Sequence, residues 1–167
     1  MSPKRNKHKG EAAPPESYDI PRPSQPLPII KVVGISGGGK STLVGALRPG
    51  GYDARPVSQE HSNVPDLWKR FDRPDYVLYL FASLEDQERR RQDVSWSAKA
   101  HQEEMDRLAH AREHADLRIN TGELDPQEVY AVVLSFLKLR RVRHANHPLP
   151  PLRATGSAIV PAPDGTD

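Results

Sequence analysis

The amino-acid sequence predicts an α/β protein in which helices cover both faces of a small parallel sheet of four to five strands. Three observations carry this prediction. A β-branched run occurs at residues 28–33 and a continuous apolar run at 76–82, and shorter strand-like runs occur at 52–58 and 115–120. Segments with helical periodicity separate these runs, the clearest at residues 126–140. Such an alternation is typical of a three-layer α/β/α arrangement.

The first half of the chain supplies two of these strands and one helix. The run at residues 28–33 leads directly into a glycine-rich sequence at 34–42. A short helix follows, with apolar residues at helical spacing, and ends at Pro49. The next strand, at 52–58, contains Pro56, which favours an edge position because proline cannot donate to the ladder.

The middle of the chain is predicted to hold a short helix and the central strand. Residues 63–71 have apolar side chains at helical spacing, with Asn63 as a cap. The run at 76–82 is apolar throughout, which indicates a strand that is buried on both faces. Ser83 resembles the start of a capped helix.

Two further helices complete the predicted order. A polar helix from Ser97 to about His114 has only a narrow apolar stripe, so we expect it to cover part of a site instead of joining the core. After the strand at 115–120, Asp125 and Glu128 form a capping box with proline at the first helical position. The helix that follows is expected to pack on the sheet.

Proline is concentrated at both ends of the chain. Seven of the 17 prolines lie within the first 28 residues, and five more lie beyond residue 147. Such segments hold too little apolar surface to offset the entropy of ordering. We therefore predict one domain at residues 28–140, between a basic disordered tail at 1–27 and a second disordered tail at 141–167.

The composition excludes several classes of protein. There are no cysteines, which excludes disulfides and thiolate zinc sites. No apolar run approaches the length of a membrane span, and no hydrophobic signal-peptide core follows the charged N-terminus. We expect a cytoplasmic protein with no membrane partner. The net charge is +2, and the basic runs near both ends are typical of solvated tails, so nucleic acid is not the expected partner.

The sequence GISGGGKST, from Gly34 to Thr42, matches the phosphate-binding pattern G-x-x-x-x-G-K-[ST]. Glycines let a backbone turn its N–H groups toward phosphate oxygens. Lys40 would bridge the β- and γ-phosphates, and the Ser41 hydroxyl would complete a Mg²⁺ shell. A flexible turn is the alternative, but a turn does not need Lys-Ser after its last glycine. The predicted nucleotide-binding residues are Gly34, Ser36, Gly37, Gly38, Gly39, Lys40, Ser41 and Thr42.

Phosphoryl transfer also needs a group that orients the acceptor or holds the metal. Glu60 lies near the carboxyl end of the second predicted strand, and ligands of open α/β sheets bind at that edge. We therefore predict Glu60 as a catalytic base or Mg²⁺ ligand. An exposed loop carboxylate is the alternative interpretation.

Positive charge beside the transferred phosphate is the last requirement. Arg89, Arg90 and Arg91 occupy one helix and cannot all face one way, because successive residues are about 100° apart. We assign Arg89 and Arg91, together with Lys40, to catalysis. The alternative is a charged helix surface in which Glu85 and Glu88 are the partners of the arginines.

Four segments together resemble P-loop kinases of small molecules and nucleotides, of the adenylate- or thymidylate-kinase type. They are GISGGGKST, PDYVLYLFASLEDQERRR, the polar lid-like stretch from Gln92 to Glu113, and ADLRINTGELDPQEV. The set is also similar to small bacterial ATP-binding, kinase-like proteins. The resemblance implies a P-loop NTPase fold, ATP and Mg²⁺ as cofactors, and an adenine contact at the Thr121-Gly122 turn. The sequence departs from the family between Gln59 and Arg73. Only about 15 residues stand there, where the kinases have a longer region that binds the phosphate acceptor.

The leading prediction is thus an ATP-dependent, Mg²⁺-requiring phosphotransferase that moves the γ-phosphate to an unidentified small-molecule acceptor. The alternative is a nucleotide-binding regulatory module, or slow NTPase, that acts through a protein partner. The compact acceptor region, and the lack of an apolar strand that ends in an acidic residue, favour the alternative. ATP is preferred over GTP because the sequence has no guanine-recognition motif of the N-K-x-D type.

Overall fold

A computed structural model describes residues 25–152, which form one four-stranded sheet with every strand parallel. Residues 1–24 and 153–167, which make up most of the predicted tails at 1–27 and 141–167, lie outside the described residues. The strand order is β2-β1-β3-β4, so the edge position expected for the second strand is confirmed, as is the interior position of the third. The strands are β1 (Ile29–Gly34), β2 (Asp53–Pro56), β3 (Tyr76–Phe81) and β4 (Leu117–Asn120).

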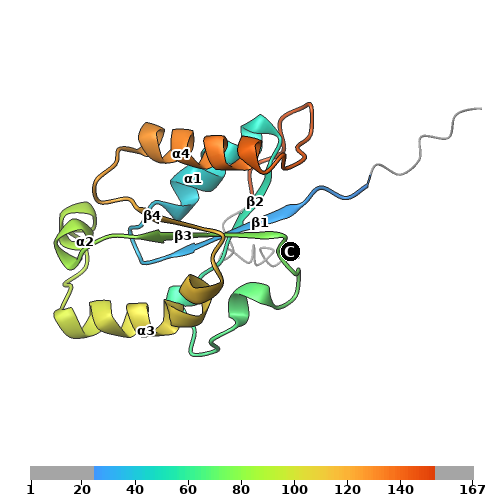
Figure 1. The fold of residues 1–167 in the computed structure, drawn as a ribbon. Coiled ribbons are helices and arrows are strands. Elements are labelled where there is room, and N and C mark those ends of the chain that lie inside the picture. Colours follow the sequence, from blue (N-terminus) through green and yellow to red (C-terminus); the bar gives the residue numbers. More distant parts are fainter. Residues whose placement is uncertain (1–24, 153–167) are drawn as a thin grey trace, which may run out of the picture.

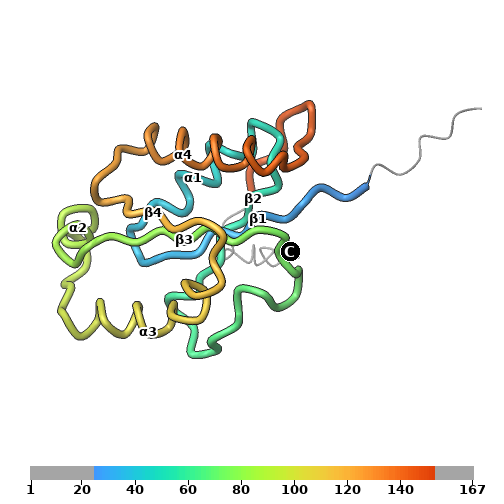
Figure 2. The backbone as a smooth tube through the Cα atoms, viewed as in Figure 1, coloured from blue at the N-terminus to red at the C-terminus, as the bar shows by residue number. Residues whose placement is uncertain are grey.

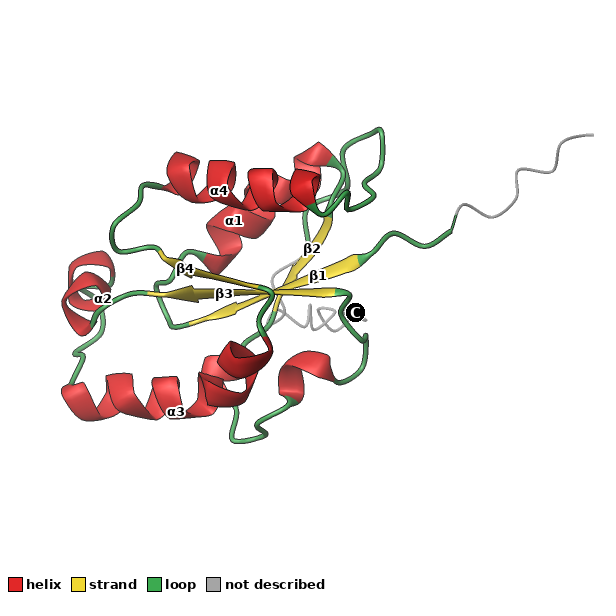
Figure 3. Cartoon of the chain, viewed as in Figure 1, coloured by secondary structure: helices red, strands yellow, loops and turns green. Residues whose placement is uncertain are grey.

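Helices cover both faces of this sheet. In Figure 1, α1 (Lys40–Leu47) and α4 (Pro126–Leu139) lie over one face and α3 (Ala98–His114) lies over the other. The short helix α2 (Leu84–Arg90) follows the carboxyl end of β3. Figure 3 shows the yellow strands as a single layer between the red helices. The predicted α/β class, with a small parallel sheet, is confirmed.

Each face of the sheet has its own apolar core. Alternate residues of a strand point to opposite faces, so Ile30 and Val32 of β1 pack toward α1 and α4, whereas Val33 packs toward α3. All three side chains are fully buried. Burial of such side chains stabilises a fold by about 1.5–3 kcal/mol each, which explains why the interior strand β3 is continuously apolar in sequence.

Helix α3 belongs to the core, and the expectation that it would only cover a site is wrong. Its Leu108 and Ala111 side chains are fully buried in the cluster that contains Val33 and Tyr79. The small Ala111 side chain lets the helix backbone approach the sheet closely. A narrow apolar stripe is therefore enough to seat a helix whose other faces are polar.

The helix predicted at residues 63–71 is not formed. This segment contains only a 3₁₀ turn at Leu67–Lys69, preceded by another at Gln59–His61. The reason is the fully buried Gln59, whose Nε2 donates to the Val64 carbonyl at 2.8 Å while its Oε1 accepts the Trp68 N–H at 2.9 Å. A side chain thus satisfies backbone groups that a helix would have paired within itself.

Residues 141–152, beyond the predicted domain boundary at 140, pack against the turn that precedes β2. Val142 is 6% exposed and lies in the core, and the Ala145 N–H donates to the Gly51 carbonyl at 2.9 Å. Gly51 has φ +89°, and a Cβ there would lie 2.1 Å from the Ala145 oxygen, so this contact needs glycine. Figure 2 shows this red segment returning beside the turn before β2. We call residues 141–152 the C-terminal arm.

Arg48 ties the C-terminal arm to β2. Its Nε donates to the Pro150 carbonyl at 2.6 Å, and its NH1 donates to Asp53 Oδ1 at 3.1 Å. Burial alone would raise the pKa of Asp53, but hydrogen bonds and charge from Arg55 and Arg48 hold that pKa below its ordinary value. Asp53 is therefore an ionised anchor in this network.

Candidate functional site

The glycine loop, residues 34–42, connects the carboxyl end of β1 to the start of α1. Gly34 allows β3 to pass closely, because a Cβ at this position would lie 2.3 Å from the Leu80 carbonyl oxygen. Gly37 and Gly39 have φ values of +74° and +94°, which side chains rarely tolerate. Glycine is thus required at three places in this loop by its observed conformation.

The loop ends where α1 begins. The residue before α1, Gly39, makes no side-chain cap, and the first N–H groups of a helix have no partner within it. These groups and the helix dipole make the start of α1 favourable for an anion.

Lys40 and Glu60, both predicted as site residues, are brought together. Lys40 Nζ lies 3.1 Å from Glu60 Oε1, and their side chains are 12% and 4% exposed. The same ammonium donates to the carbonyls of Gly34 at 2.9 Å and Ile35 at 3.0 Å. The lysine is therefore folded back onto the loop, and Glu60 is a buried carboxylate instead of an exposed loop residue.

Glu60 also has an unpaired oxygen. Its Oε2 is buried and has no hydrogen-bond partner among the described residues. Buried carboxylate oxygens are normally satisfied, and hard cations such as Mg²⁺ take oxygen ligands. The chemical types of this oxygen and of the Ser41 hydroxyl, a carboxylate and an alcohol, are ones that Mg²⁺ accepts as ligands.

His61 lies beside the same carboxylate. Its Nε2 is 3.5 Å from both Glu60 Oε1 and Ser36 Oγ. Both contacts use one ring nitrogen, so these residues do not form a nucleophile–base–acid relay, which needs both nitrogens.

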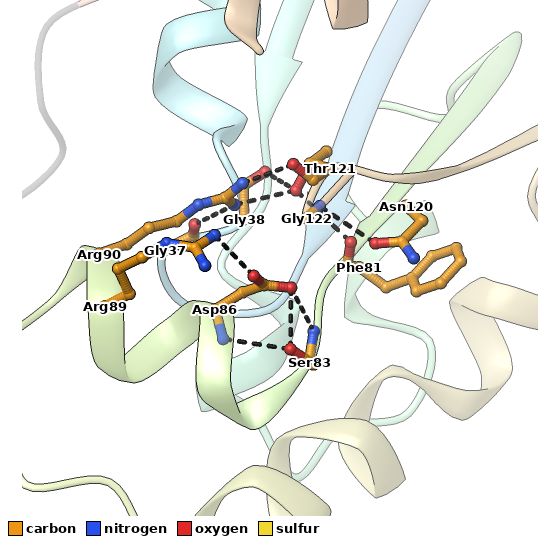
Figure 4. Close-up of polar contacts among 10 residues, drawn as sticks. All are labelled: Gly37, Gly38, Phe81, Ser83, Asp86, Arg89, Arg90, Asn120, Thr121 and Gly122. Carbon is orange, nitrogen blue, oxygen red and sulfur yellow. Dashed lines mark hydrogen bonds and ion pairs between the residues drawn. The ribbon is translucent and has the colours of Figure 1, made fainter. Parts of the chain in front are cut away.

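Arg90 is the arginine of this run that hydrogen-bonds to the glycine loop, and Arg91 lies beside Gly37 without a hydrogen bond to it. Figure 4 shows the Arg90 guanidinium directed at the loop, where NH1 donates to the Gly37 carbonyl at 3.0 Å. NH1 and NH2 also donate to Thr121 Oγ1 and O, at 3.0 and 2.5 Å. Arg89 and Arg91 pair with Asp86 and Asp93, at 2.7 and 3.0 Å. The sequence identified the run of three arginines as a candidate. Which of them faces the loop depends on how the helix is rotated about its axis, and the sequence does not show this.

Thr121 fixes the turn after β4 to the same loop. It is 3% exposed, and its Oγ1 lies 3.0 Å from the Gly38 carbonyl. The next residue, Gly122, leaves no space for a side chain, since a Cβ there would lie 2.0 Å from Asp86 Oδ2. The ends of β1, β3 and β4 thus meet around the glycine loop (Figure 4).

Two cavities open on this loop. One, of about 340 Å³, is lined by residues 37–42 together with Arg90 and Arg91. The other, of about 240 Å³, continues from Gly37–Gly39 and Arg90 to an apolar wall. That wall consists of Leu43, Leu124, Pro126 and Val129. A basic cavity and a partly apolar cavity therefore share one glycine-lined boundary.

Two residues that matter to the loop were absent from the sequence prediction. Glu104 accepts the Ser36 N–H, and Gln87 donates to the Ser36 carbonyl. Both side chains are buried although both are polar. A buried polar side chain is the feature that would have identified Glu104 and Gln87, and burial cannot be read from the sequence.

Three further searches, for metal clusters and membrane-spanning helices among the described residues and for similar proteins, gave negative results. Across residues 25–152, no group of three or more His, Cys, Asp or Glu side chains is arranged to hold a metal ion. No helix in this range is long and apolar enough to cross a membrane. Comparison with protein-family models gave no match, and neither did comparison with curated proteins.

Proposed function

We propose that this protein binds Mg·ATP at the glycine loop and transfers the γ-phosphate to a small-molecule acceptor. One observation carries the proposal: a loop of the sequence GISGGGKST joins the end of an interior parallel strand to the start of α1. Arg90 lines both cavities on that loop, and Lys40 lines the basic one. The proposed class is that of the P-loop kinases, which the sequence resembles.

Lys40 is the residue whose contacts would change on binding. Its ammonium is held by two carbonyls and one carboxylate, and the phosphates of a nucleotide carry more negative charge than this single carboxylate. We expect Lys40 to exchange Glu60 for a phosphate oxygen. The N–H groups at the start of α1 would hold the neighbouring phosphate oxygens.

Glu60 and Ser41 would hold the cation. When bound, Mg²⁺ neutralises charge that develops on the phosphate oxygens. Glu60 would supply the oxygen that lacks a partner, Oε2, once Lys40 has turned toward phosphate. Release of Glu60 from its ion pair would thereby couple nucleotide binding to metal binding.

The partly apolar cavity fits the nucleoside. Leu124, Pro126 and Val129 contribute apolar lining, while Arg90 and Thr121 contribute polar groups to the same cavity. Ligand sites generally combine an apolar surface with a few placed polar groups. The apolar lining lies across the glycine loop from Glu60, so base and acceptor would occupy opposite sides.

A nucleotide-binding regulatory module, or slow NTPase, is the second candidate. The packing after β2 favours it. Gln59 and Trp68, which are 0% and 6% exposed, fill the space between the sheet and α3 where an acceptor beside Glu60 would lie. Under this proposal the bound nucleotide would gate a protein partner.

The decisive test of binding is Lys40→Ala. Isothermal titration with Mg·ATP should show a loss of affinity of about tenfold or more, because a charge-assisted contact to phosphate is removed. Lys99→Ala is the matched control, since it removes the same charge from a side chain that is 87% exposed. Equal affinity in the wild type and Lys40→Ala would refute the proposed site.

Release of ADP separates the two candidates. Wild-type protein is mixed with Mg·ATP alone and then with pooled nucleosides, sugars, nucleotides and small metabolites. Acceleration by one pool, absent in Lys40→Ala, supports the phosphotransferase. Tight binding that no pool accelerates supports the regulatory module.

A further inference from the structure

Ser36, within the glycine loop, is held at both of its backbone polar groups by buried side chains from other elements. Its N–H donates to Glu104 of α3, at 3.0 Å to Oε1 and 3.3 Å to Oε2. Its carbonyl accepts Nε2 of Gln87, on α2, at 2.9 Å. Ser36, Gln87 and Glu104 are 5%, 0% and 4% exposed.

The two holding side chains are themselves connected. Gln87 Nε2 lies 3.4 Å from Glu104 Oε1, and Gln87 Oε1 lies 2.5 Å from His101 Nδ1. We call these four residues, Ser36, Gln87, His101 and Glu104, the Ser36 clamp. The clamp joins the loop to α2 and α3 in one hydrogen-bonded group.

Core packing alone does not account for Glu104. Burying a carboxylate is costly unless donors surround it, and Glu104 makes no ion pair with any described Lys, Arg or His. Its partners within hydrogen-bond distance are the Ser36 N–H and the Gln87 amide. An apolar side chain would pack there at lower cost, so the observed contact is what the carboxylate contributes.

The loop after Ser36 needs such a fixed point. Three consecutive glycines, Gly37–Gly39, follow it, and glycine loses more conformational freedom on ordering than any other residue. Gly37 and Gly39 are nevertheless held in single left-handed conformations. Fixing both polar groups of Ser36 sets the direction in which the chain enters this stretch.

We propose that Glu104 is a positioning residue for the glycine loop, acting through the Ser36 N–H. The inference rests on the proposed function, since the consequence is that Mg·ATP affinity depends on a side chain of α3. Preorganisation of this kind lowers the ordering cost of binding. It also makes α3 part of the site, although α3 does not line either cavity on the loop.

Three substitutions of Glu104 in the full chain test the proposal. Glu104→Ala should weaken Mg·ATP binding about tenfold in isothermal titration, as losses of supporting residues commonly do. Glu104→Gln keeps an oxygen that can accept the Ser36 N–H and should stay within about threefold of the wild type. Glu104→Asp keeps the charge but is one methylene shorter, so it should behave like Glu104→Ala.

The matched control is Glu103→Ala, which removes a carboxylate from the same helix at a side chain that is 48% exposed. It should leave the affinity unchanged. If Glu104→Ala does not fold, the affinities of Glu104→Gln and Glu104→Asp decide whether Glu104 acts through its hydrogen bond to Ser36. Rescue by Asp but not by Gln would overturn the proposal, because charge would then matter and the hydrogen bond would not.

Hydrogen exchange without nucleotide provides an independent measurement. The Ser36 amide should exchange at least about tenfold faster in Glu104→Ala than in the wild type, because its acceptor is gone. Unchanged protection of this amide would overturn the clamp. If the wild type fails to bind Mg·ATP, the proposed function fails, whereas the exchange experiment still tests the clamp.

Discussion

At the scale of single residues, the ion pair between Lys40 and Glu60 is the feature that most directly links structure to chemistry. Both side chains are largely buried, and their charged atoms are 3.1 Å apart. Removing one partner of a buried pair leaves the other charge without compensation. Each residue therefore restrains the other, and phosphate would enter as a competing partner for the lysine.

This restraint predicts the behaviour of Glu60→Gln. Without the carboxylate, Lys40 loses a competitor for phosphate while Mg²⁺ loses one ligand, and these opposite effects should leave the Mg·ATP affinity little changed. Turnover should fall by about 10²-fold or more, the usual contribution of a positioned base or metal carboxylate. Titration calorimetry and steady-state ADP release measure the two effects separately.

Glu113→Gln is the control, because it makes the same change at an exposed position of α3. Wild-type turnover in Glu60→Gln would remove Glu60 from the mechanism. A parallel loss of affinity and turnover would instead indicate that Glu60 acts by holding the loop.

At the scale of secondary-structure elements, the start of α2 determines which arginine reaches the glycine loop. Ser83 Oγ accepts the Asp86 N–H at 3.1 Å, and Asp86 Oδ2 accepts the Ser83 N–H at 3.2 Å, which is a capping box. Hydrogen bonds from Ser83 lower the pKa of Asp86, as does its contact with Arg89. With the first turn fixed in this way, Arg90 faces the loop and Arg89 faces Asp86.

Removing this cap should affect both stability and binding. Ser83→Ala is expected to lower the free energy of unfolding by about 1 kcal/mol, the typical loss for an N-cap. It should also weaken Mg·ATP binding several-fold, because α2 is short and Arg90 lies in its last turn. Urea denaturation and calorimetry measure the two quantities.

Ser95→Ala provides the comparison, since Ser95 is exposed and lies outside every helix. It should change neither quantity. A variant of Ser83 that loses stability but binds Mg·ATP normally would show that the position of Arg90 does not depend on the cap.

At the scale of the whole molecule, the C-terminal arm packs against the turn that precedes β2, the edge strand of the sheet. It contributes Val142 to the core and accepts a hydrogen bond from Arg48 at Pro150. In turn, Arg48 contacts Asp53 and the Ala54 carbonyl. An edge strand with free backbone groups is a site of unwanted pairing, and Arg48, which the arm contacts, reduces that exposure.

The arm should therefore be needed for stability. A chain of residues 1–140 is expected to unfold with a free energy about 3 kcal/mol lower than a chain of residues 1–152. This figure combines the burial of a valine with the loss of one or two hydrogen bonds. Urea denaturation of both chains measures it, and equal stability would show that residues 28–140 suffice.

The order of strands and helices could be predicted because it depends on local patterns. The strand at 76–82 is continuously apolar, and the helix after Asp125 carries its own cap, so neighbouring residues contain the information. The helix predicted at 63–71 does not form, because the Gln59 side chain hydrogen-bonds to the Val64 carbonyl and the Trp68 N–H. Composition also does not reveal that Val142, two residues beyond the predicted boundary at 140, lies in the core.

What the sequence by itself determined was the α/β class, the parallel sheet and the candidate loop at Gly34–Thr42, because periodicity and glycine spacing are properties of adjacent residues. Only the tertiary structure decided that Arg90 contacts this loop, that Glu60 pairs with Lys40, and that Glu104 holds Ser36. Ser36 and Glu104 are 68 residues apart in the chain. Contacts of this kind depend on how helices pack across a sheet, which no local pattern encodes.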